Sequence, residues 1–505
     1  MNMNTHPVAV LFAVLVMFCS CTKNFDEVAR NPNSPETVTP SLLFTQIALD
    51  LASPSYGKPF FYSSLVTRQA IWTEGIESYQ YYFFDRASFY GYSVLRDVQK
   101  MTQEAERTNE EVYVGLGHFF NAWYFYDMTM TFGDIPYSDA LKGETNGEYA
   151  PKYDLQEDVF VGILDQLEQA NQMLAEVDGN LSGDVVYDNN IAKWRQAVNS
   201  FTLRVLISLS KRAGDSKIDV AGKFAQIIDN PNRYPIFTSN ADNLQLKFRD
   251  VGGQRYPFWN SSFRLYPYLD EFFTSILKEK QDRRLFYYAE PTAKALSDGL
   301  KADDFNAYRG GDGTAGIGDL QALEAAKEIS KVNERYYLEF DAEPYVQLGY
   351  AEQAFTIAEA AYRGWITADA AAFYNEGIRA SMEFFREYAK VDEGLAIDER
   401  YIADYLASDA VAYDQAQGLE QIITQKYIAS FLNSGWTDYY TYRRTGLPNL
   451  PVDPSTSLNE RDKSMIPLRW NYPQKELDYN TQNVEEAIKR QFGEDNVNAS
   501  MWLLK

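Results

Sequence analysis

Cysteine and histidine are almost absent from this sequence of 505 residues, which contains two of each. Cys19 and Cys21 lie together in the N-terminal stretch VMFCSCTKNFDE, and His6 precedes them, so His118 is the one histidine of the remaining chain. This leaves little material for nucleophile–histidine catalysis or for a metal site built from His and Cys. We therefore expect no catalytic centre or metal centre of these kinds, and no cofactor.

Positive charge is also scarce, since 47 Lys and Arg face 71 Asp and Glu and the net charge is −24. Such an acidic surface repels nucleic acid and anionic membrane surfaces, which argues against both as partners. It fits a highly soluble body that binds neutral ligands. Aromatic residues are abundant by contrast, with 37 Tyr, 31 Phe and 8 Trp. Tyrosine has an apolar ring and a polar tip, which suits half-exposed surfaces.

The apolar run VAVLFAVLVMF, residues 8–18, is too short for a membrane-spanning helix, which needs about 20 residues. Its length is typical of the core of a secretory signal peptide, although the preceding residues contain no Lys or Arg. The run ends in FCSC, a loose match to a bacterial lipobox. We expect residues 1–20 to be removed and Cys21 to become the lipidated first residue.

The two cysteines have three other interpretations. A signal-anchor helix with incidental cysteines is one, which the short length of the apolar run disfavours. A disulfide between Cys19 and Cys21 would strain the usual geometry, because only one residue separates them. Lipidation at Cys19 would place Met17 and Phe18 at positions that require small residues. Lipidation at Cys21 agrees best with the residues.

The body of the chain, residues 21–505, has the pattern of a mostly α protein that forms a single domain. Asp154 is the expected N-cap of one helix, with Glu157 completing a capping box, and Gly133 is expected to end the helix before it. Between the helices we expect irregular insertions, which in compact domains are usually functional. The expected helices are 109–131, 154–174, 191–211, 351–365, 368–385 and 419–432, and the insertions are about 52–92, 230–345 and 440–505.

Several motifs in a fixed order resemble the SusD/RagB family of outer-membrane lipoproteins. No single motif decides this, but the ordered set from Asn31 to Asn480 is specific. The motifs are NPNSPETVTPSLLF (31–44), FGDIPYSDAL (132–141), PKYDLQEDVF (151–160), KWRQAVNSFTLRVLISLSKR (193–212), QDRRL (281–285), YAEQAFTIAEAAYRGW (350–365), YNEGIRASM (374–382), QIITQKYIA, RRTGLP and RWNYPQKELDYN.

The resemblance implies a helical scaffold of four tetratricopeptide-like helix pairs with a loop-rich ligand-binding half. It also implies a non-catalytic lipoprotein on the cell surface that acts as a lid over a TonB-dependent β-barrel transporter, resembling SusC, and captures oligosaccharide. The stretch KNFDE after Cys21 is similar to the acidic surface-export signal of Bacteroidetes lipoproteins. A peptide-binding lid of the RagB type is the alternative.

Two aromatic stretches have the composition of a sugar site. Residues 72–92 contain nine aromatics beside several acids and amides, and residues 255–268 contain six. Sugars offer apolar faces and a rim of hydroxyls, which match aromatic rings bordered by planar polar groups. Core packing explains the same composition equally well. By resemblance, the expected ligand contacts are Trp72, Tyr79, Tyr81, Tyr82, Trp259 and Asn260.

Two other features favour structure over catalysis. In FGDIPY, Asp134 is expected to bond backbone amides of its own turn, which makes a rigid junction between a helix and a loop. Neighbouring carboxylates such as Glu110 and Glu111 are unavoidable among 71 acids. Glycoside hydrolysis needs two carboxylates about 5–9 Å apart, one with a raised pKa, and adjacency in sequence does not supply this. A secreted hydrolase is therefore the remote alternative.

Overall fold

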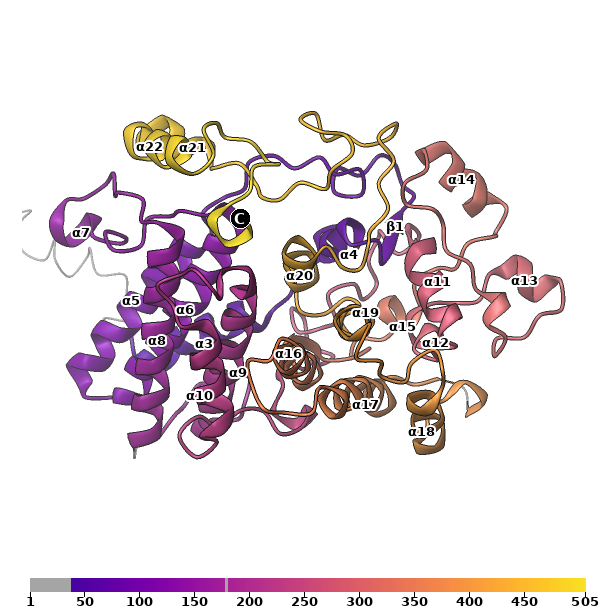
Figure 1. Cartoon of the computed structure of the whole chain (residues 1–505), viewed down its shortest axis with the longest axis horizontal. Coiled ribbons are helices and arrows are strands. Elements are labelled where there is room, and N and C mark those ends of the chain that lie inside the picture. Colours follow the sequence, from indigo (N-terminus) through magenta and orange to yellow (C-terminus); the bar gives the residue numbers. More distant parts are fainter. Residues whose placement is uncertain (1–37, 178–179, 392) are drawn as a thin grey trace, which may run out of the picture. The chain divides into compact units, whose positions relative to one another are not determined.

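The computed structural model describes residues 38–177, 180–391 and 393–505 (Figure 1). Cys21 and the predicted signal peptide lie outside the described residues. The longer helices are α3 (Pro40–Ala52), α5 (Gly91–Thr108), α6 (Glu111–Phe132), α8 (Gln156–Glu176), α9 (Ile191–Ser208), α10 (Val220–Asp229), α11 (Glu271–Glu279), α14 (Ile317–Ala325), α16 (Tyr350–Tyr362), α17 (Ala370–Tyr388), α18 (Glu399–Ala407), α19 (Gly418–Ala429), α20 (Thr437–Thr445) and α22 (Thr481–Gln491).

Short helices and strands lie mainly between these. The short helices are α4 (Tyr62–Val66), α7 (Gly143–Asn146), α12 (Leu285–Tyr288), α13 (Ala293–Ser297), α15 (Arg335–Leu338) and α21 (Gln474–Tyr479). The strands form two antiparallel pairs, β1 (Ala70–Trp72) with β3 (Pro267–Leu269) and β2 (Leu244–Leu246) with β4 (Tyr345–Leu348). The prediction of a mostly helical fold is confirmed.

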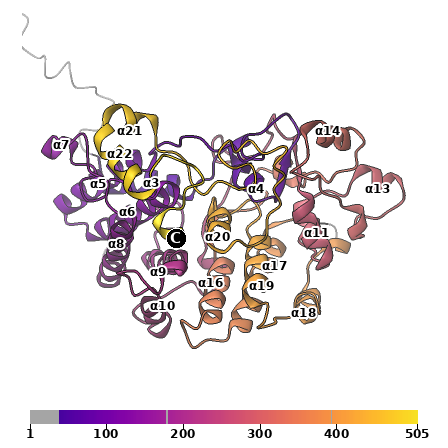
Figure 2. The ribbon, with the colours of Figure 1, turned by 45° about the horizontal axis from the view of Figure 1, so that its top comes forward.

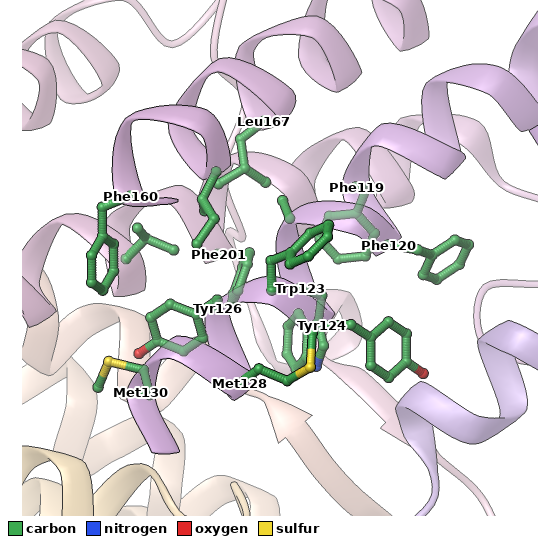
Figure 3. Close-up of a cluster of buried hydrophobic side chains, with 14 of the residues drawn as sticks. Phe119, Phe120, Trp123, Tyr124, Tyr126, Met128, Met130, Phe160, Leu167 and Phe201 are labelled. Atoms are coloured by element: carbon green, nitrogen blue, oxygen red, sulfur yellow. The ribbon is translucent and has the colours of Figure 1, made fainter. Parts of the chain in front are cut away.

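Helix α6 lies at the centre of the larger hydrophobic core. Almost every position from Val112 to Phe132 is buried, and the helix packs against α3, α5, α8 and α9. Figure 3 shows its aromatic side chains meeting those of neighbouring helices. The ring of Trp123 stacks on that of Phe201 in α9, with centroids 4.3 Å apart. A helix that is hydrophobic on nearly all sides must be enclosed by others, which explains its position.

The long helices pack in series along the chain. After α6, α8 packs on α9, α9 packs on α16, and α16 packs on α17 and α19 (Figures 1 and 2). A second core forms around the later helices, with Phe273, Tyr288 and Phe431 stacked together at 4.6–5.8 Å between ring centroids. The series of paired helices places the two cores side by side, with α9 and α16 at the boundary.

Buried ion pairs join the helices at this boundary. The Arg204 guanidinium on α9 donates to the Glu352 carboxylate on α16 from Nε at 2.8 Å, and Arg444 on α20 pairs with Glu359 on α16. Burial opposes ionisation of Glu359, yet the adjacent Arg444 guanidinium lowers the pKa of this carboxyl to about 2. These pairs fix α9 and α20 onto α16, because a buried charge without its partner is strongly unfavourable.

The predicted helix boundaries agree with the structure to within a few residues, but the predicted cap of α8 is wrong. The N-cap position is Leu155, one residue after Asp154, and it provides no side-chain cap. The N–H of Gln156 instead donates to Asp134 Oδ1 at 2.8 Å, so the aspartate of FGDIPY caps the next helix. Asp134 therefore does not bond amides of its own turn as expected.

Asp154, at the start of the α8 segment, in turn bonds backbone amides of the loop that contains FGDIPY. Its Oδ2 accepts hydrogen bonds from the backbone N–H groups of Tyr137 and Ser138, both at 2.8 Å. The N–H of Asp154 also donates to the carbonyl of Ile135 at 3.0 Å. Each aspartate thus bonds amides of the other segment: Asp134 caps α8, and Asp154 holds the loop that follows α6. This exchange ties the loop after α6 to the start of α8. The rigid junction that the sequence predicts is present, by a different set of bonds.

The three insertions meet on one side of the scaffold. Pairing of β1 with β3 joins the first insertion to the second, and the C-terminal segment lies over both. The N–H of Leu458 donates to the carbonyl of Tyr81 at 2.7 Å, and Thr456 Oγ1 donates to the carbonyl of Thr314 at 2.6 Å. In Figures 1 and 2 the C-terminal segment, in yellow, runs past α4 and β1. Aromatic stretches far apart in sequence are therefore brought together.

We predict that Asp134→Ala destabilises the protein by about 1–3 kcal/mol, because it leaves the buried N–H of Gln156 and the guanidinium of Arg490 without their acceptor. Urea unfolding followed by circular dichroism measures this change. Asp139→Ala is the matched control on the same loop, since it breaks only the half-exposed pair with Lys142 and should cost about 0–1 kcal/mol. Equal losses for the two variants would contradict the exchanged caps.

Candidate ligand-binding cleft

A cleft lined by aromatic rings lies between α3, α6 and α9 on one side and α20 with the loop before α5 on the other. It consists of two adjoining cavities of about 290 Å³ and 180 Å³. Both are lined by Tyr90, Asp127, Trp436 and Tyr440, which therefore stand where the cavities meet. We call these two cavities together the aromatic cleft.

The periodicity of α6 builds one wall of the cleft. Trp123, Asp127 and Thr131 are four residues apart, so their side chains share one face of the helix. Trp123 and Asp127 line the first cavity, and Asp127 and Thr131 line the second. This face is the stripe of α6 that no other helix covers completely, and Asp127 is exposed there although its neighbours Tyr126 and Met128 are buried.

The opposite wall comes from the start of α20 and from the insertions. Trp436 precedes the first residue of α20, and its ring lies 4.9 Å from that of Trp470 and 5.5 Å from that of Tyr79. The indole N–H of Trp470 donates to the hydroxyl of Tyr79 at 3.2 Å. These contacts hold three half-buried or buried rings in fixed orientations, and they connect the first insertion to the last.

Two charged side chains in the first cavity are already bonded. The hydroxyl of Tyr124 donates to Asp50 Oδ2 at 2.7 Å, and the hydroxyl of Tyr90 donates to Asp50 Oδ1. Arg204 lines the same cavity while it pairs with Glu352 and donates to the carbonyl of Gln347 at 2.8 Å. Asp127 differs from both, because within the described residues its carboxylate has no hydrogen bond or ion pair.

The protonation states in the cleft follow from these contacts. The hydrogen bond to Asp50, together with burial, raises the pKa of Tyr90 to about 12, so this hydroxyl remains protonated at neutral pH. The side chain of Asp127 is open to the cleft, but the protein packed around it reduces its hydration and raises its pKa to about 6. Asp127 is therefore mostly ionised at neutral pH and becomes protonated below about pH 6. The cleft therefore offers hydroxyl and carboxylate groups to a ligand beside flat aromatic surfaces.

Comparison with known families agrees with the fold. A family model described as starch-binding associating with outer membrane, SusD-like, matches residues 32–473. The chain belongs to the SusD-like family. Among curated proteins none matches this SusD-like chain.

Solved structures of SusD homologues superpose closely on this SusD-like chain. One from Bacteroides fragilis has a TM-score of 0.88 and 39% identity over 93% of this chain and 100% of its own. A second from the same species has a TM-score of 0.84 at the same identity and coverage. A chitin-binding SusD homologue from Flavobacterium johnsoniae has a TM-score of 0.69 at 20% identity, covering 92% of this chain and 98% of its own, and shares the fold.

Of the residues predicted as ligand contacts, Tyr79 lines the cleft, whereas three others are packed in the interior. Trp72 is completely buried between Phe263 and Tyr266, with ring centroids 5.8 Å and 5.9 Å away. Tyr81 and Tyr82 are 3% and 1% exposed, and each hydroxyl donates to a backbone carbonyl. The described conformation gives these three a role in packing, which is the interpretation that composition left open.

Trp259 and Asn260 lie in the second insertion and do not line the cleft. The ring of Trp259 is half-buried beneath the guanidinium of Arg255, whose Cζ is 4.3 Å from the ring centroid. Asn260 is exposed, and its backbone N–H donates to the carbonyl of Tyr337 at 2.8 Å. Both side chains are accessible to a ligand, so their role in binding stays a prediction.

The sequence analysis missed Asp127, Trp436 and Trp470. Asp127 had a detectable signal, since it is a lone acid in the apolar stretch from Leu116 to Phe132. Trp436 had one as well, since residues 431–442, FLNSGWTDYYTY, contain five aromatics in 12 positions, a density similar to that of residues 72–92. Trp470 had none, because the residues around it show no such excess. Their importance arises from tertiary packing against Tyr79.

Two other cavities suit a sugar less well. One of about 50 Å³ among α16, α17 and α19 is lined by Glu352, Lys426 and Asp438 and has room for a few water molecules only. The other, about 710 Å³ beside α11, is an open groove lined mostly by charged and amide side chains, and Phe305 is its one aromatic lining residue. Neither combines several rings with converging polar groups, as carbohydrate sites do.

The described residues contain no cluster of three or more His, Cys, Asp or Glu side chains able to hold a metal ion. Across the same part of the chain, each helix is too short or too polar to cross a membrane. His118 is half-buried, and its Nδ1 is 2.7 Å from Gln166 Oε1.

We predict that Trp72→Ala costs about 3–5 kcal/mol of folding stability, because it empties a fully buried site in the second core. Trp259→Ala should cost about 1 kcal/mol or less, since its ring is half-exposed. Denaturant unfolding of both variants measures the difference. If Trp72→Ala left stability unchanged, the packing role assigned to this ring would be wrong.

Proposed function

We propose that this SusD-like chain is a non-catalytic binding lipoprotein of the cell surface, which captures oligosaccharides in the aromatic cleft and delivers them to a TonB-dependent outer-membrane transporter. The observation that carries the proposal is the aromatic cleft itself. Trp436, Tyr90 and Tyr440 surround a hollow that also contains carboxylates and a guanidinium. Family membership supports the ligand class, because the family is described as starch-binding.

The cleft has the chemistry that a pyranose ring requires. Aromatic faces pack against the C–H surface of a sugar, and tyrosine hydroxyls and carboxylates at the edge bond its hydroxyls. Trp436 is the central ring, since it lines both cavities and contacts Tyr79 and Trp470. Two adjoining cavities that share one wall of rings provide neighbouring subsites for an oligosaccharide.

Binding without hydrolysis is part of the proposal. Asp50 and Asp127 both line the first cavity, and a pair of carboxylates with one raised pKa is what a glycosidase uses. Asp50, however, accepts hydrogen bonds from two tyrosine hydroxyls, which engage the oxygens that a nucleophile or a base would need free. We therefore assign these carboxylates to recognition.

We predict that Trp436→Ala weakens oligosaccharide binding by about tenfold or more, because a ring that stacks on a ligand contributes on the order of 1–3 kcal/mol. Isothermal titration calorimetry against a panel of α- and β-linked oligosaccharides measures the loss. The release of reducing sugar ends, which would reveal hydrolysis, is measured in the same samples.

Trp365→Ala is the matched control, since Trp365 is a half-buried tryptophan that packs on Phe224 outside the cleft. It should leave affinity unchanged. Binding of peptides in place of every sugar would move the assignment to the peptide-binding alternative. Turnover of any sugar that is abolished by Asp50→Asn or Asp127→Asn would make the protein a hydrolase.

The membrane anchor and the transporter rest on the sequence, because Cys21 lies outside the described residues. We predict that the wild-type protein fractionates with the outer membrane and, in mild detergent, co-purifies with a large β-barrel. Cys21→Ala should release the protein from the membrane or block its maturation, since it removes the acylated side chain.

Cys19→Ala is the control and should change neither outcome. If it behaved like Cys21→Ala, the proposed cleavage site would be wrong. Recovery of a lone protein without a β-barrel would count against delivery to a transporter and leave sugar binding standing.

A further inference from the structure

Asp127 is placed as a binding group rather than as a structural one. It lies on α6 at the junction of the two cavities and is exposed to them. Within the described residues no hydrogen bond or ion pair reaches its carboxylate. Asp50, in the same cleft, accepts from two tyrosine hydroxyls and is thereby part of the wall. Asp127 performs no comparable task for the fold.

The cations nearest to the cleft are bonded to other groups, and neither of them pairs with Asp127. Arg204 pairs with Glu352, and its guanidinium lies over the ring of Trp123 with Cζ 5.5 Å from the centroid. Arg443 donates from Nη1 to the carbonyl of Leu468 at 2.6 Å and from Nη2 to that of Met130 at 2.8 Å. The negative charge of Asp127 therefore remains available to a ligand.

The rings around Asp127 suit a positive charge as well. Tyr90, Trp436 and Tyr440 line both cavities together with Asp127. The face of an aromatic ring attracts cations, and such attraction strengthens when the group is removed from water. An ammonium group at this place could form an ion pair with the carboxylate and cation–π contacts with the three aromatic rings. The net charge of −24 also favours the approach of a cationic ligand.

Leaving this carboxylate without a partner is unfavourable for the protein alone. Although its side chain is open to the cleft, the surrounding protein removes part of its hydration and raises its pKa to about 6. A ligand cation would remove this penalty. Groups that weaken folding but await a partner are typical of binding sites.

We propose that Asp127, with Tyr90, Trp436 and Tyr440, forms a subsite for the ammonium group of an amino sugar, so that the cleft prefers oligosaccharides containing N-deacetylated hexosamine. This proposal rests on the proposed function and refines its ligand class. An amino sugar fits better than a lysine side chain, because the wall of rings matches the apolar face of a pyranose that carries the ammonium beside it.

The test compares three ligands of equal length by calorimetry at about pH 7: glucosamine oligomers, N-acetylglucosamine oligomers and cello-oligosaccharides. We expect the wild-type protein to bind the glucosamine oligomer about tenfold or more tightly than the other two, because a charge-assisted hydrogen bond contributes an affinity of about this size. Asp127→Asn should abolish this preference while binding of the uncharged sugars remains. Asp127→Glu should keep part of it.

Asp409→Asn is the matched control, since Asp409 is an exposed carboxylate on another part of the molecule and does not line the cleft. It should keep the full preference. Thermal unfolding followed by circular dichroism confirms that the variants fold, and Asp127→Asn should unfold at the same temperature or higher, because it removes a poorly solvated charge.

The pH dependence provides a second readout. Asp127 is protonated as the pH falls through about 6, while the amines of the ligand gain protons over the same range. The preference for the glucosamine oligomer should therefore fall about tenfold or more between about pH 6 and about pH 4, while cello-oligosaccharide binding stays constant. The other ionisable or charged groups that line the cleft are Asp50 on α3, Tyr90 before α5, Tyr124 and Tyr126 on α6, Arg204 on α9, Tyr345 on β4, Tyr440 on α20 and Tyr79 in the first insertion.

Each outcome separates this proposal from the proposed function. Equal affinity for the charged and uncharged sugars, or a preference that Asp127→Asn retains, would overturn the ammonium subsite and leave glycan binding intact. Failure of every sugar to bind would overturn the proposed function. Binding of lysine peptides that depends on Asp127, without binding of glucosamine oligomers, would assign the subsite to a peptide and overturn the proposal.

Discussion

The burial of α6 is the constraint on which the rest of the structure depends. This helix is apolar on nearly every side, so it must be enclosed by α3, α5, α8 and α9 before its backbone can be stable. Enclosure by these helices leaves the stripe with Asp127 and Thr131 only partly covered, beside the buried ring of Trp123. The insertions close over that stripe. The scaffold and the cleft are thus two results of one packing requirement.

The boundary between the two cores determines how firmly the cleft is held. Arg204 belongs to both the boundary and the cleft, since its guanidinium pairs with Glu352 on α16 and also lines the first cavity. Lys426 on α19 lies 3.7 Å from the same carboxylate, where burial lowers the pKa of the ammonium. If one of these charged groups lost its partner, the remaining buried charge would strongly destabilise the fold. The wall behind the ligand is therefore rigid, whereas the wall formed by the insertions rests on ring contacts.

Sequence reasoning could predict the helices and not the site, for a physical reason. Periodicity over 20 residues identifies α6 and α8, because the apolar spacing reports a local property. The partners of Asp134 and Asp154 are non-local. The sequence predicts that each aspartate bonds amides close to it in the chain, but Asp134 accepts from Gln156 and Asp154 accepts from Tyr137. Composition flagged Trp72, Tyr81 and Tyr82 equally with Tyr79, because a ring that packs in a core and a ring that meets a ligand have the same chemistry. Tertiary contacts separate them, since Trp72 lies on β1 against β3 and the hydroxyls of Tyr81 and Tyr82 bond distant backbone carbonyls.

The exchange of caps between Asp134 and Asp154 also bears on how the chain assembles. A helix end that is capped by its own neighbour can form early, from local contacts alone. Here the start of α8 and the loop after α6 gain these partners only when the two segments have met, whereas α6 itself ends on a local bond from the N–H of Gly133 to the carbonyl of Thr129. Fraying at one end would therefore expose the other. Amide hydrogens on both sides of the junction belong to one cooperative unit, which opens as a whole or not at all.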